Sequence, residues 1–206
     1  YDCYSAIHLE DVADLDIKAV AISSSHTLGD KPVPGTDRST DWYSGQGITL
    51  IGNNNHLKWS VTQDTISNIN HGMYVYVGNP ITGATTEIKN NMLYDQNRSA
   101  RFAGLTALQY MLQGITVAGP GLGNSNTVTI KENTLTGVFN GIELNNLKSA
   151  VATVENNQLQ LSDKTMSTIG TPQFGISALY CQDATISANT VSTSTLGSKV
   201  NAINMK

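Results

Sequence analysis

Two short sequence patterns recur in alternation along this chain, and they constrain its fold more than any other feature. The first pattern is apolar-x-x-Asn-x-apolar, and its copies start at Ile88, Ile130, Val154 and Ile186, with a weaker copy at Ile66-Ser-Asn68. The second is Gly-apolar-x-apolar, and its copies start at Gly47, Gly72, Gly114, Gly141 and Gly175. Both patterns alternate apolar with polar residues, which is the periodicity of β-strands. The sequence therefore predicts a repeat protein built from short strands.

The spacing of the repeats predicts how the strands are arranged. Successive Gly-apolar strands start 25, 42, 27 and 34 residues apart, by subtraction of their positions in the sequence. The shorter steps fit one coil, and the longer steps fit one coil with an inserted loop. Stacked coils bury a continuous apolar core that no single coil can form. We expect an all-β fold, a right-handed parallel β-helix solenoid of about six to seven coils, with inserted loops at 24–46, 94–112 and 160–173.

The repeats also predict which side chains face inward. Ile130, Ile142 and Val154 occupy the apolar positions of their strands, so they should point into the core. The recurrent asparagine lies where the chain turns between strands, and stacked asparagine side chains can hydrogen-bond along the axis and satisfy turn backbone groups. We therefore expect a structural ladder, not a catalytic column, made of Asn91, Asn133, Asn157 and Asn189.

The repeats extend over nearly the whole sequence, which predicts a single β-helix domain over residues 1–206. A strand-like segment stands at each end, and neither end carries an amphipathic capping helix. Solenoids need polar caps at their ends. We expect the chain to be an excised middle part of a longer protein.

Composition excludes several classes of function. The net charge is −4 and no run of Lys or Arg occurs, so a nucleic-acid partner is not expected. The apolar stretches are far shorter than the ~18 residues of a membrane helix, so membrane insertion is not expected either. Two cysteines and four histidines show no metal-ligand spacing, and we interpret the histidines as surface or turn residues. No metal and no other cofactor is expected.

The repeats resemble the pectate-lyase-like β-helix superfamily, and in style they are closest to the β-helices of phage tailspikes and polysaccharide depolymerases. The closest match lies in 128–135, 140–144 and 151–157. The resemblance implies a protein outside the cell, on a virion or at a cell surface, that binds and depolymerises a polysaccharide as a hydrolase or lyase. A tailspike-like protein would be a homotrimer. The acidic motifs of polygalacturonases and alginate epimerases do not occur in this sequence.

The outward residues of the Gly-apolar strands form a column in which Glu143 is the one central acid. Glycoside hydrolysis needs two carboxyl groups, about 5 Å apart in retaining enzymes and about 6.5–9.5 Å apart in inverting enzymes. We predict that Glu143 is catalytic and choose Asp163, in an inserted loop, as its partner. Asp183 and Asp95 are the alternative partners.

Several aromatic and basic residues are candidates for carbohydrate binding. Tyr74 and Tyr76 project from one strand on the same face, and Trp42 and Tyr43 end the first insertion beside several carboxylates. Aromatic faces suit the C–H patches of sugar rings. Arg98, in the second insertion, offers the cation that a sugar acid needs. The alternative function is a non-catalytic adhesin or structural β-helix of a virion or cell envelope, which would show the same repeats without an acid pair.

Overall fold

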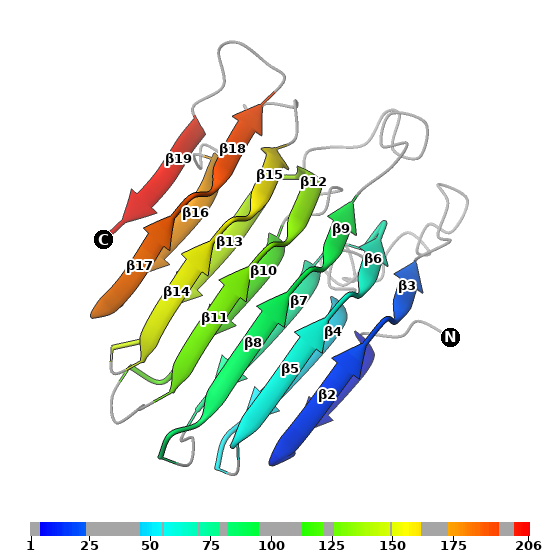
Figure 1. Ribbon diagram of the computed structural model, residues 1–206, viewed down its shortest axis with the longest axis vertical. Helices are drawn as coiled ribbons and strands as arrows, with labels where there is room; N and C mark the ends of the chain where they lie inside the picture. The colour runs from blue at the N-terminus through cyan, green and yellow to red at the C-terminus, as the bar shows by residue number, and fades with distance from the viewer. Residues whose placement is uncertain are drawn as a thin grey trace, which may run out of the picture.

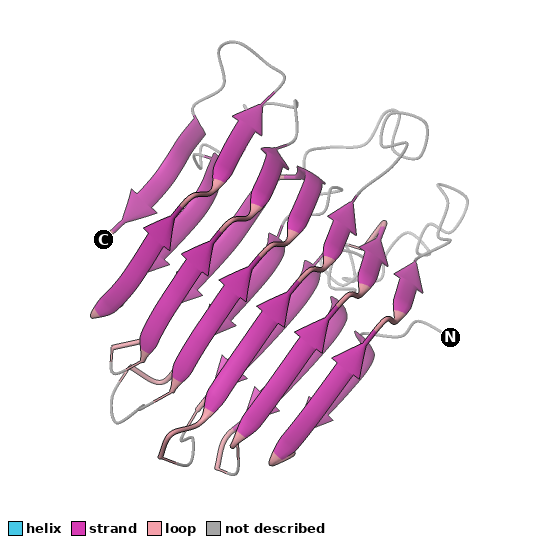
Figure 2. Ribbon diagram, viewed as in Figure 1, coloured by secondary structure: helices cyan, strands magenta, loops and turns pink. Residues whose placement is uncertain are grey.

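The computed structural model describes residues 5–23, 46–54, 56–69, 71–78, 82–94, 113–121, 126–148, 150–161, 173–193 and 200–206. All the regular structure in these ranges is β-strand (Figure 2), and the strands form three parallel sheets. Sheet A contains β1 (Ser5–Glu10), β4 (Gln46–Gly52), β7 (His71–Val77), β10 (Gln113–Ala118), β13 (Asn140–Asn145), β16 (Gln173–Leu179) and β19 (Val200–Met205). Sheet B contains β2 (Asp14–Lys18), β5 (Lys58–Thr62), β8 (Thr85–Lys89), β11 (Thr127–Lys131), β14 (Val151–Glu155) and β17 (Asp183–Ser187). Sheet C contains β3 (Ala21–Ser23), β6 (Thr65–Ser67), β9 (Met92–Tyr94), β12 (Thr134–Val138), β15 (Gln158–Leu161) and β18 (Thr190–Thr193).

The strand order identifies the fold. Hydrogen-bonded neighbours are three strands apart in the chain, as in the order β1-β4-β7-β10-β13-β16-β19 of sheet A, so each coil passes once through all three sheets. The described coils stack from the blue strands β1–β3 to the red β19 (Figure 1). This arrangement confirms the predicted all-β parallel solenoid of six to seven coils. Within the described part of the chain, no helix is long and apolar enough to cross a membrane.

The core has the predicted register. Ile130, Ile142 and Val154 are fully buried, as expected from the alternation in their strands. Ile142 lies between Ile115 and Ile176 of the neighbouring coils, so equivalent side chains stack in columns along the axis. The burial of these columns between the three sheets supplies the hydrophobic stabilisation that one coil lacks.

The glycine of the second pattern is required by a close approach between coils. A Cβ atom added to Gly114 would lie 2.5 Å from the carbonyl oxygen of Gly141 on the next coil and 2.4 Å from Leu135 Cδ2. Real Cβ atoms do not approach backbone oxygens so closely, so a side chain at this position would force neighbouring coils apart. This steric limit explains why glycine recurs near the start of β4, β7, β10, β13 and β16 in sheet A.

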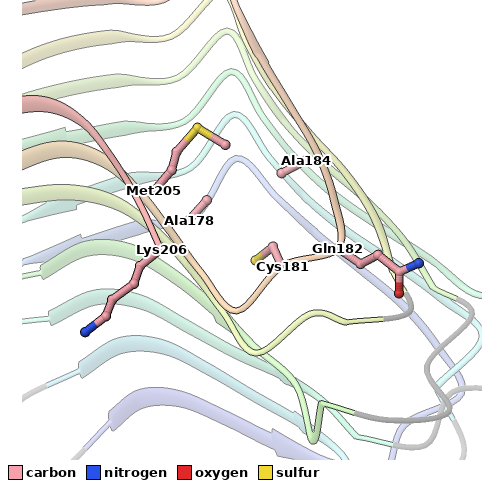
Figure 3. A pocket seen from close by; sticks show the side chains of 6 residues that line it. All are labelled: Ala178, Cys181, Gln182, Ala184, Met205 and Lys206. Atoms are coloured by element: carbon pink, nitrogen blue, oxygen red, sulfur yellow. The ribbon is translucent and has the colours of Figure 1, made fainter.

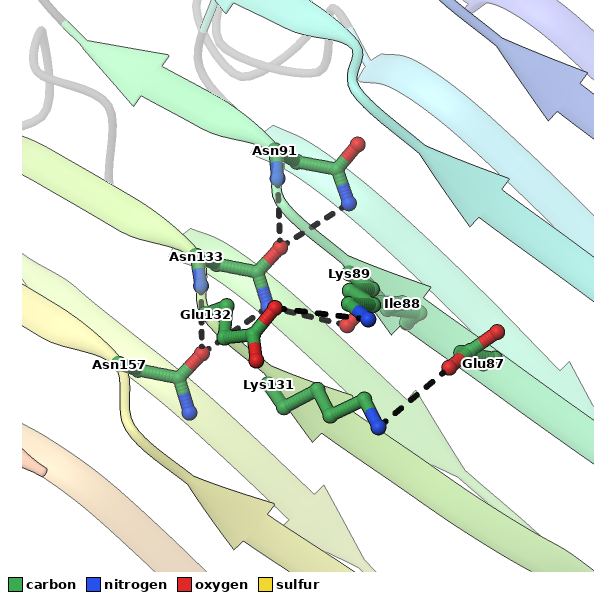
Figure 4. A network of polar contacts seen from close by, with 8 residues as sticks. All are labelled: Glu87, Ile88, Lys89, Asn91, Lys131, Glu132, Asn133 and Asn157. Atoms are coloured by element: carbon green, nitrogen blue, oxygen red, sulfur yellow. Dashed lines mark hydrogen bonds and ion pairs between the residues drawn. The ribbon is translucent and has the colours of Figure 1, made fainter. Parts of the chain in front are cut away.

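The asparagine ladder exists and lies at the turn between sheets B and C (Figure 4). The side-chain amide of Asn133 shows the pattern: Oδ1 accepts hydrogen bonds from the backbone N and Nδ2 of Asn91, at 2.9 and 3.0 Å. Its Nδ2 donates to Asn157 Oδ1 and to the Ile88 carbonyl, at 3.0 Å each. Asn157 makes the same contacts to Asn189. The predicted ladder is thereby confirmed.

One predicted copy of the first pattern is wrong. Asn68 of the weak copy Ile66-Ser-Asn68 follows β6, and its backbone N donates to the Tyr94 carbonyl. The ladder position of this coil is Asp64, whose backbone N donates to Asn91 Oδ1 at 2.9 Å. The register was missed because this coil reads Val61-x-x-Asp64-x-Ile66, with aspartate in place of the signature asparagine.

Candidate functional site

The strand register of sheet A brings the predicted outward column together. Thr116 is paired with Tyr74 on one side and with Glu143 on the other, so these three residues occupy consecutive strands. The full column contains His8, Thr49, Tyr74, Thr116, Glu143, Ser177 and Asn204. Tyr76 lies in the adjacent column, which it shares with Ala118 and Asn145. The predicted common face for both tyrosines and Glu143 is therefore present.

This face is less exposed than an outward column of a solenoid would normally be. Thr116 and Thr49 are buried, and Ser177 has no exposed surface. Tyr74 and Glu143 are partly exposed. The hydroxyl groups are satisfied within the face: Ser177 Oγ, for example, accepts a hydrogen bond of 3.2 Å from Asn204 Nδ2. The polar side chains of sheet A therefore lie in a partly desolvated environment, where electrostatic interactions are stronger than in water.

Desolvation changes the protonation of Glu143. Partial burial raises the pKa of this carboxyl, because a charged carboxylate loses solvation there. Asn145 Nδ2, two residues along the same strand, lies 3.5 Å from Glu143 Oε1, a long contact for a hydrogen bond. A raised pKa favours the protonated carboxyl, which is the form that acts as a general acid.

His71 is a component of this face that the sequence analysis missed. Its Nε2 lies 3.2 Å from Thr116 Oγ1, and its ring meets Tyr74 edge-on with centroids 5.9 Å apart. Burial lowers the pKa of His71 to about 4, so its imidazole is neutral near pH 7. The available signal was its position directly before the repeated glycine, which is polar in several coils: Gln46, His71, Gln113 and Asn140.

His56 lies at a turn, as the histidines were expected to, but it is buried and not at the surface. His56 has no exposed surface, and its ring packs against Trp59 with centroids 4.1 Å apart. Its Nε2 lies 3.1 Å from the Thr85 carbonyl oxygen. Burial lowers the pKa of this imidazole too. His56 lies away from the sheet A face, so it contributes to packing at a turn.

Replacing His71 with glutamine should make the free energy of unfolding fall less steeply as pH decreases from 7 to 4. The folded pKa of His71 is lowered to about 4, so its contribution to stability is complete above the unfolded value of about 6.5 and is lost as pH falls through this window. The full effect is at most about 3 kcal/mol. Urea unfolding of the wild type and His71→Gln between pH 4 and 7 measures it. An unchanged slope in His71→Gln would contradict this contribution.

The remaining predicted site residues either lie outside the described residues or belong to another sheet. Asp163, Trp42, Tyr43 and Arg98 lie outside the described residues, and so does Asp95. Asp183 begins β17 of sheet B and is therefore not on the sheet with Glu143. Among the described residues, no cluster of three or more His, Cys, Asp or Glu side chains is arranged to hold a metal ion.

A cavity of about 330 Å³ lies at the last described coil (Figure 3). It is lined by Ala178, Cys181, Gln182, Ala184, Met205 and Lys206. These side chains surround the end of the core between β16, β17 and β19. Ala178 follows Ser177, the β16 partner of Glu143, but it belongs to the buried core. The cavity reflects the end of the coil stack and offers no convergent polar groups for chemistry.

We infer the fold and the sheet A face from the structure of this chain alone. No protein-family model, no curated protein and no solved structure matches the chain.

Proposed function

We propose that this protein binds and cuts a polysaccharide outside the cell, on a virion or at a cell surface, as a tailspike-like member of the pectate-lyase-like β-helices. The observation that carries the proposal is the alignment of Tyr74, Thr116 and Glu143 on consecutive strands of sheet A. A long surface of this kind, built on a rigid scaffold, matches an extended chain of sugar rings better than a compact ligand.

The dimensions of the face fit an oligosaccharide. Tyr74 and Glu143 are separated by two strand spacings, on the order of 10 Å, which is roughly the length of two sugar rings. Tyr74 and Tyr76 are partly exposed, so each offers part of its ring for stacking against sugar C–H groups. In this arrangement the tyrosines hold the polysaccharide, and Glu143 acts on a linkage further along.

Glu143 is proposed as the general acid. Its raised pKa keeps a proton available for the oxygen of the leaving sugar. Hydrolysis also requires a second carboxyl group, and we retain Asp163 for this role. The reaction breaks the bond between the anomeric carbon and the bridging oxygen, water supplies the new hydroxyl group, and Glu143 gives its proton to the leaving oxygen.

A specific observation supports the second candidate, a non-catalytic adhesin or structural β-helix. Among the described residues of the two outward columns, the nearest other carboxylate to Glu143 is Glu10, which lies four strands away in sheet A. Four strand spacings correspond to about 19 Å, too far for a pair acting on one bond. Binding without cleavage needs no second acid. In the tailspike-like role the proposed assembly is a homotrimer.

A panel of bacterial capsule and O-antigen polysaccharides tests the proposal. Release of reducing ends indicates hydrolysis, new ultraviolet absorbance from unsaturated sugars indicates a lyase, and binding without either product indicates an adhesin. If the protein neither binds nor cuts any polysaccharide of the panel, the proposal fails. Light scattering measures the molar mass and tests the trimer.

The polysaccharide identified in this way should bind Tyr74→Ala at least tenfold more weakly than the wild type. The substitution removes a ring from the proposed face, and aromatic contacts contribute about 1 kcal/mol or more beyond area burial. Calorimetry measures the affinity. Tyr94→Ala, which removes a tyrosine from β9 on sheet C, is the matched control and should bind normally. Equal affinity of both variants would exclude Tyr74 from the binding face.

A further inference from the structure

Asp64 is the one acidic rung of the ladder between sheets B and C. It follows β5 by the same two-residue step that places Asn91 after β8 and Asn133 after β11. Its backbone N donates to Asn91 Oδ1 at 2.9 Å, and its Oδ1 accepts from the backbone N of Val20 at 2.8 Å. Both bonds repeat those of the asparagine rungs, so Asp64 is an integral rung despite its different side chain.

The difference lies in the second side-chain atom. Each asparagine rung uses Nδ2 as a donor, and Asn91 Nδ2 donates to the Val61 carbonyl and to Asn133 Oδ1. Asp64 has Oδ2 at that place, and this oxygen is buried without a hydrogen-bond partner. Translated back by one coil, the contacts of Asn91 Nδ2 become the Ile17 carbonyl and Asn91 Oδ1, because Ile17 pairs with Val61. Both of these atoms are hydrogen-bond acceptors.

An ionised Asp64 is therefore poorly matched to its surroundings. A carboxylate oxygen would face two acceptor oxygens inside the fold, which leaves a buried charge unpaired at that atom. A protonated carboxyl has an O–H group that donates in the same direction as the amide of an asparagine rung. We propose that Asp64 is a proton-binding rung: its carboxyl takes up a proton when the chain folds and donates through Oδ2, completing the ladder between the first three coils.

The electrostatic surroundings act in the same direction. Burial raises the pKa of Asp64, the hydrogen bond from Val20 lowers it, and the nearby charge of Asp16 raises it. The strands that flank this turn also carry Asp14 and Lys18 on β2, Lys58 on β5, and Glu87 and Lys89 on β8. Of these, the two residues that end their strands beside the turn are Lys18 and Lys89. Lys89 is paired with Glu132, 3.5 Å away, and Lys18 is exposed, so neither lysine compensates a charge on Asp64.

The proton makes this rung sensitive to pH. Because the folded pKa is raised, the contribution of Asp64 to stability is complete below the unfolded value and is lost as pH rises through the folded value. The ladder is then complete below the folded pKa of Asp64 and interrupted at its second coil above it. The contribution of Asp64 to stability thus depends on pH in the opposite direction to those of His71 and His56, whose pKa values are lowered.

Asp64→Asn tests the proposal, because asparagine supplies a permanent donor at this rung. At pH 7 the folding equilibrium constant of Asp64→Asn should exceed that of the wild type, by a factor of ten for each unit by which folding raises the pKa of Asp64. The advantage should shrink as pH falls and vanish near pH 3. Urea unfolding from pH 3 to 8 measures both curves, and the histidine contributions cancel in their difference.

A reciprocal variant and a direct titration complete the test. Asn133→Asp places a second acid in the ladder, so it should lose stability at pH 7 and regain part of it as pH falls. The carboxyl carbon of Asp64, followed by NMR in the wild-type protein, should titrate above the ordinary value for aspartate. The proposal is overturned if that carboxyl titrates at or below the ordinary value, or if the wild type and Asp64→Asn have equal stability at every pH.

Discussion

Ile142→Asp is expected to abolish folding. Ile142 is fully buried and stacks between Ile115 and Ile176 of the neighbouring coils, so an aspartate there has no polar partner. Loss of the apolar side chain costs about 2–5 kcal/mol, and burial of an unpaired polar or charged group adds several more. The sum is comparable to the whole stability of a domain, about 5–15 kcal/mol. Circular dichroism and urea unfolding should show no cooperative transition.

The control for this experiment is Met92→Asp. Met92 is 49% exposed on β9, and its neighbours in sheet C are Thr65 and Thr134, so the new charge meets water and no acid. This variant should fold and melt cooperatively. A soluble Ile142→Asp protein that also melts cooperatively would contradict the inward register of β13.

Glu143→Gln is expected to retain binding and lose turnover by about two to four orders of magnitude on the polysaccharide that the wild type cuts. Glutamine keeps the shape of the side chain but cannot release a proton, and general acid catalysis contributes roughly 10²–10⁴-fold. Because the pKa of Glu143 is raised and its protonated form is the active one, wild-type turnover should fall as pH rises through that pKa. Reducing-end release measures turnover, and calorimetry measures binding.

Glu155→Gln provides the matched control, since Glu155 lies on β14 of sheet B, opposite Lys131 and away from the proposed face. It should cut at the wild-type rate. A normal rate for Glu143→Gln would remove Glu143 from catalysis. If Tyr74→Ala also binds normally, the sheet A face is not the ligand site, and the adhesin role becomes the better proposal.

The repeats made the fold predictable because apolar alternation recurs from coil to coil and the turn asparagine recurs in four of the coils, at Asn91, Asn133, Asn157 and Asn189. A coil without apolar alternation would expose the core, and a turn without its asparagine would leave backbone amides unpaired. Both features can therefore be read from the sequence, as at Ile142 and Asn133. The rung at Asp64 escaped prediction because an aspartate stands there in place of the signature asparagine. Its alignment becomes visible only from the hydrogen bonds to Val20 and Asn91.

The site was less predictable than the fold. Register was sufficient to place Tyr74 and Glu143 on one face, because outward side chains of parallel strands follow the same alternation as the core. The burial of Thr116 was not predictable, since alternation says which way a side chain points and not whether water reaches it. His71 escaped prediction because its contact with Thr116 joins residues of the neighbouring strands β7 and β10 and leaves no local pattern in the chain.

The two corners that flank sheet C differ in how much they can vary in length over evolution. Between sheets B and C, every coil has two connecting residues: 19–20, 63–64, 90–91, 132–133, 156–157 and 188–189. An insertion there would displace a rung and interrupt the hydrogen bonds of both neighbours. Between sheets C and A, the connections range from one residue, at 139, to the long segments 24–45 and 95–112. Descendants of such a chain are therefore free to acquire new segments at one edge of the solenoid, while the opposite edge preserves the coil count.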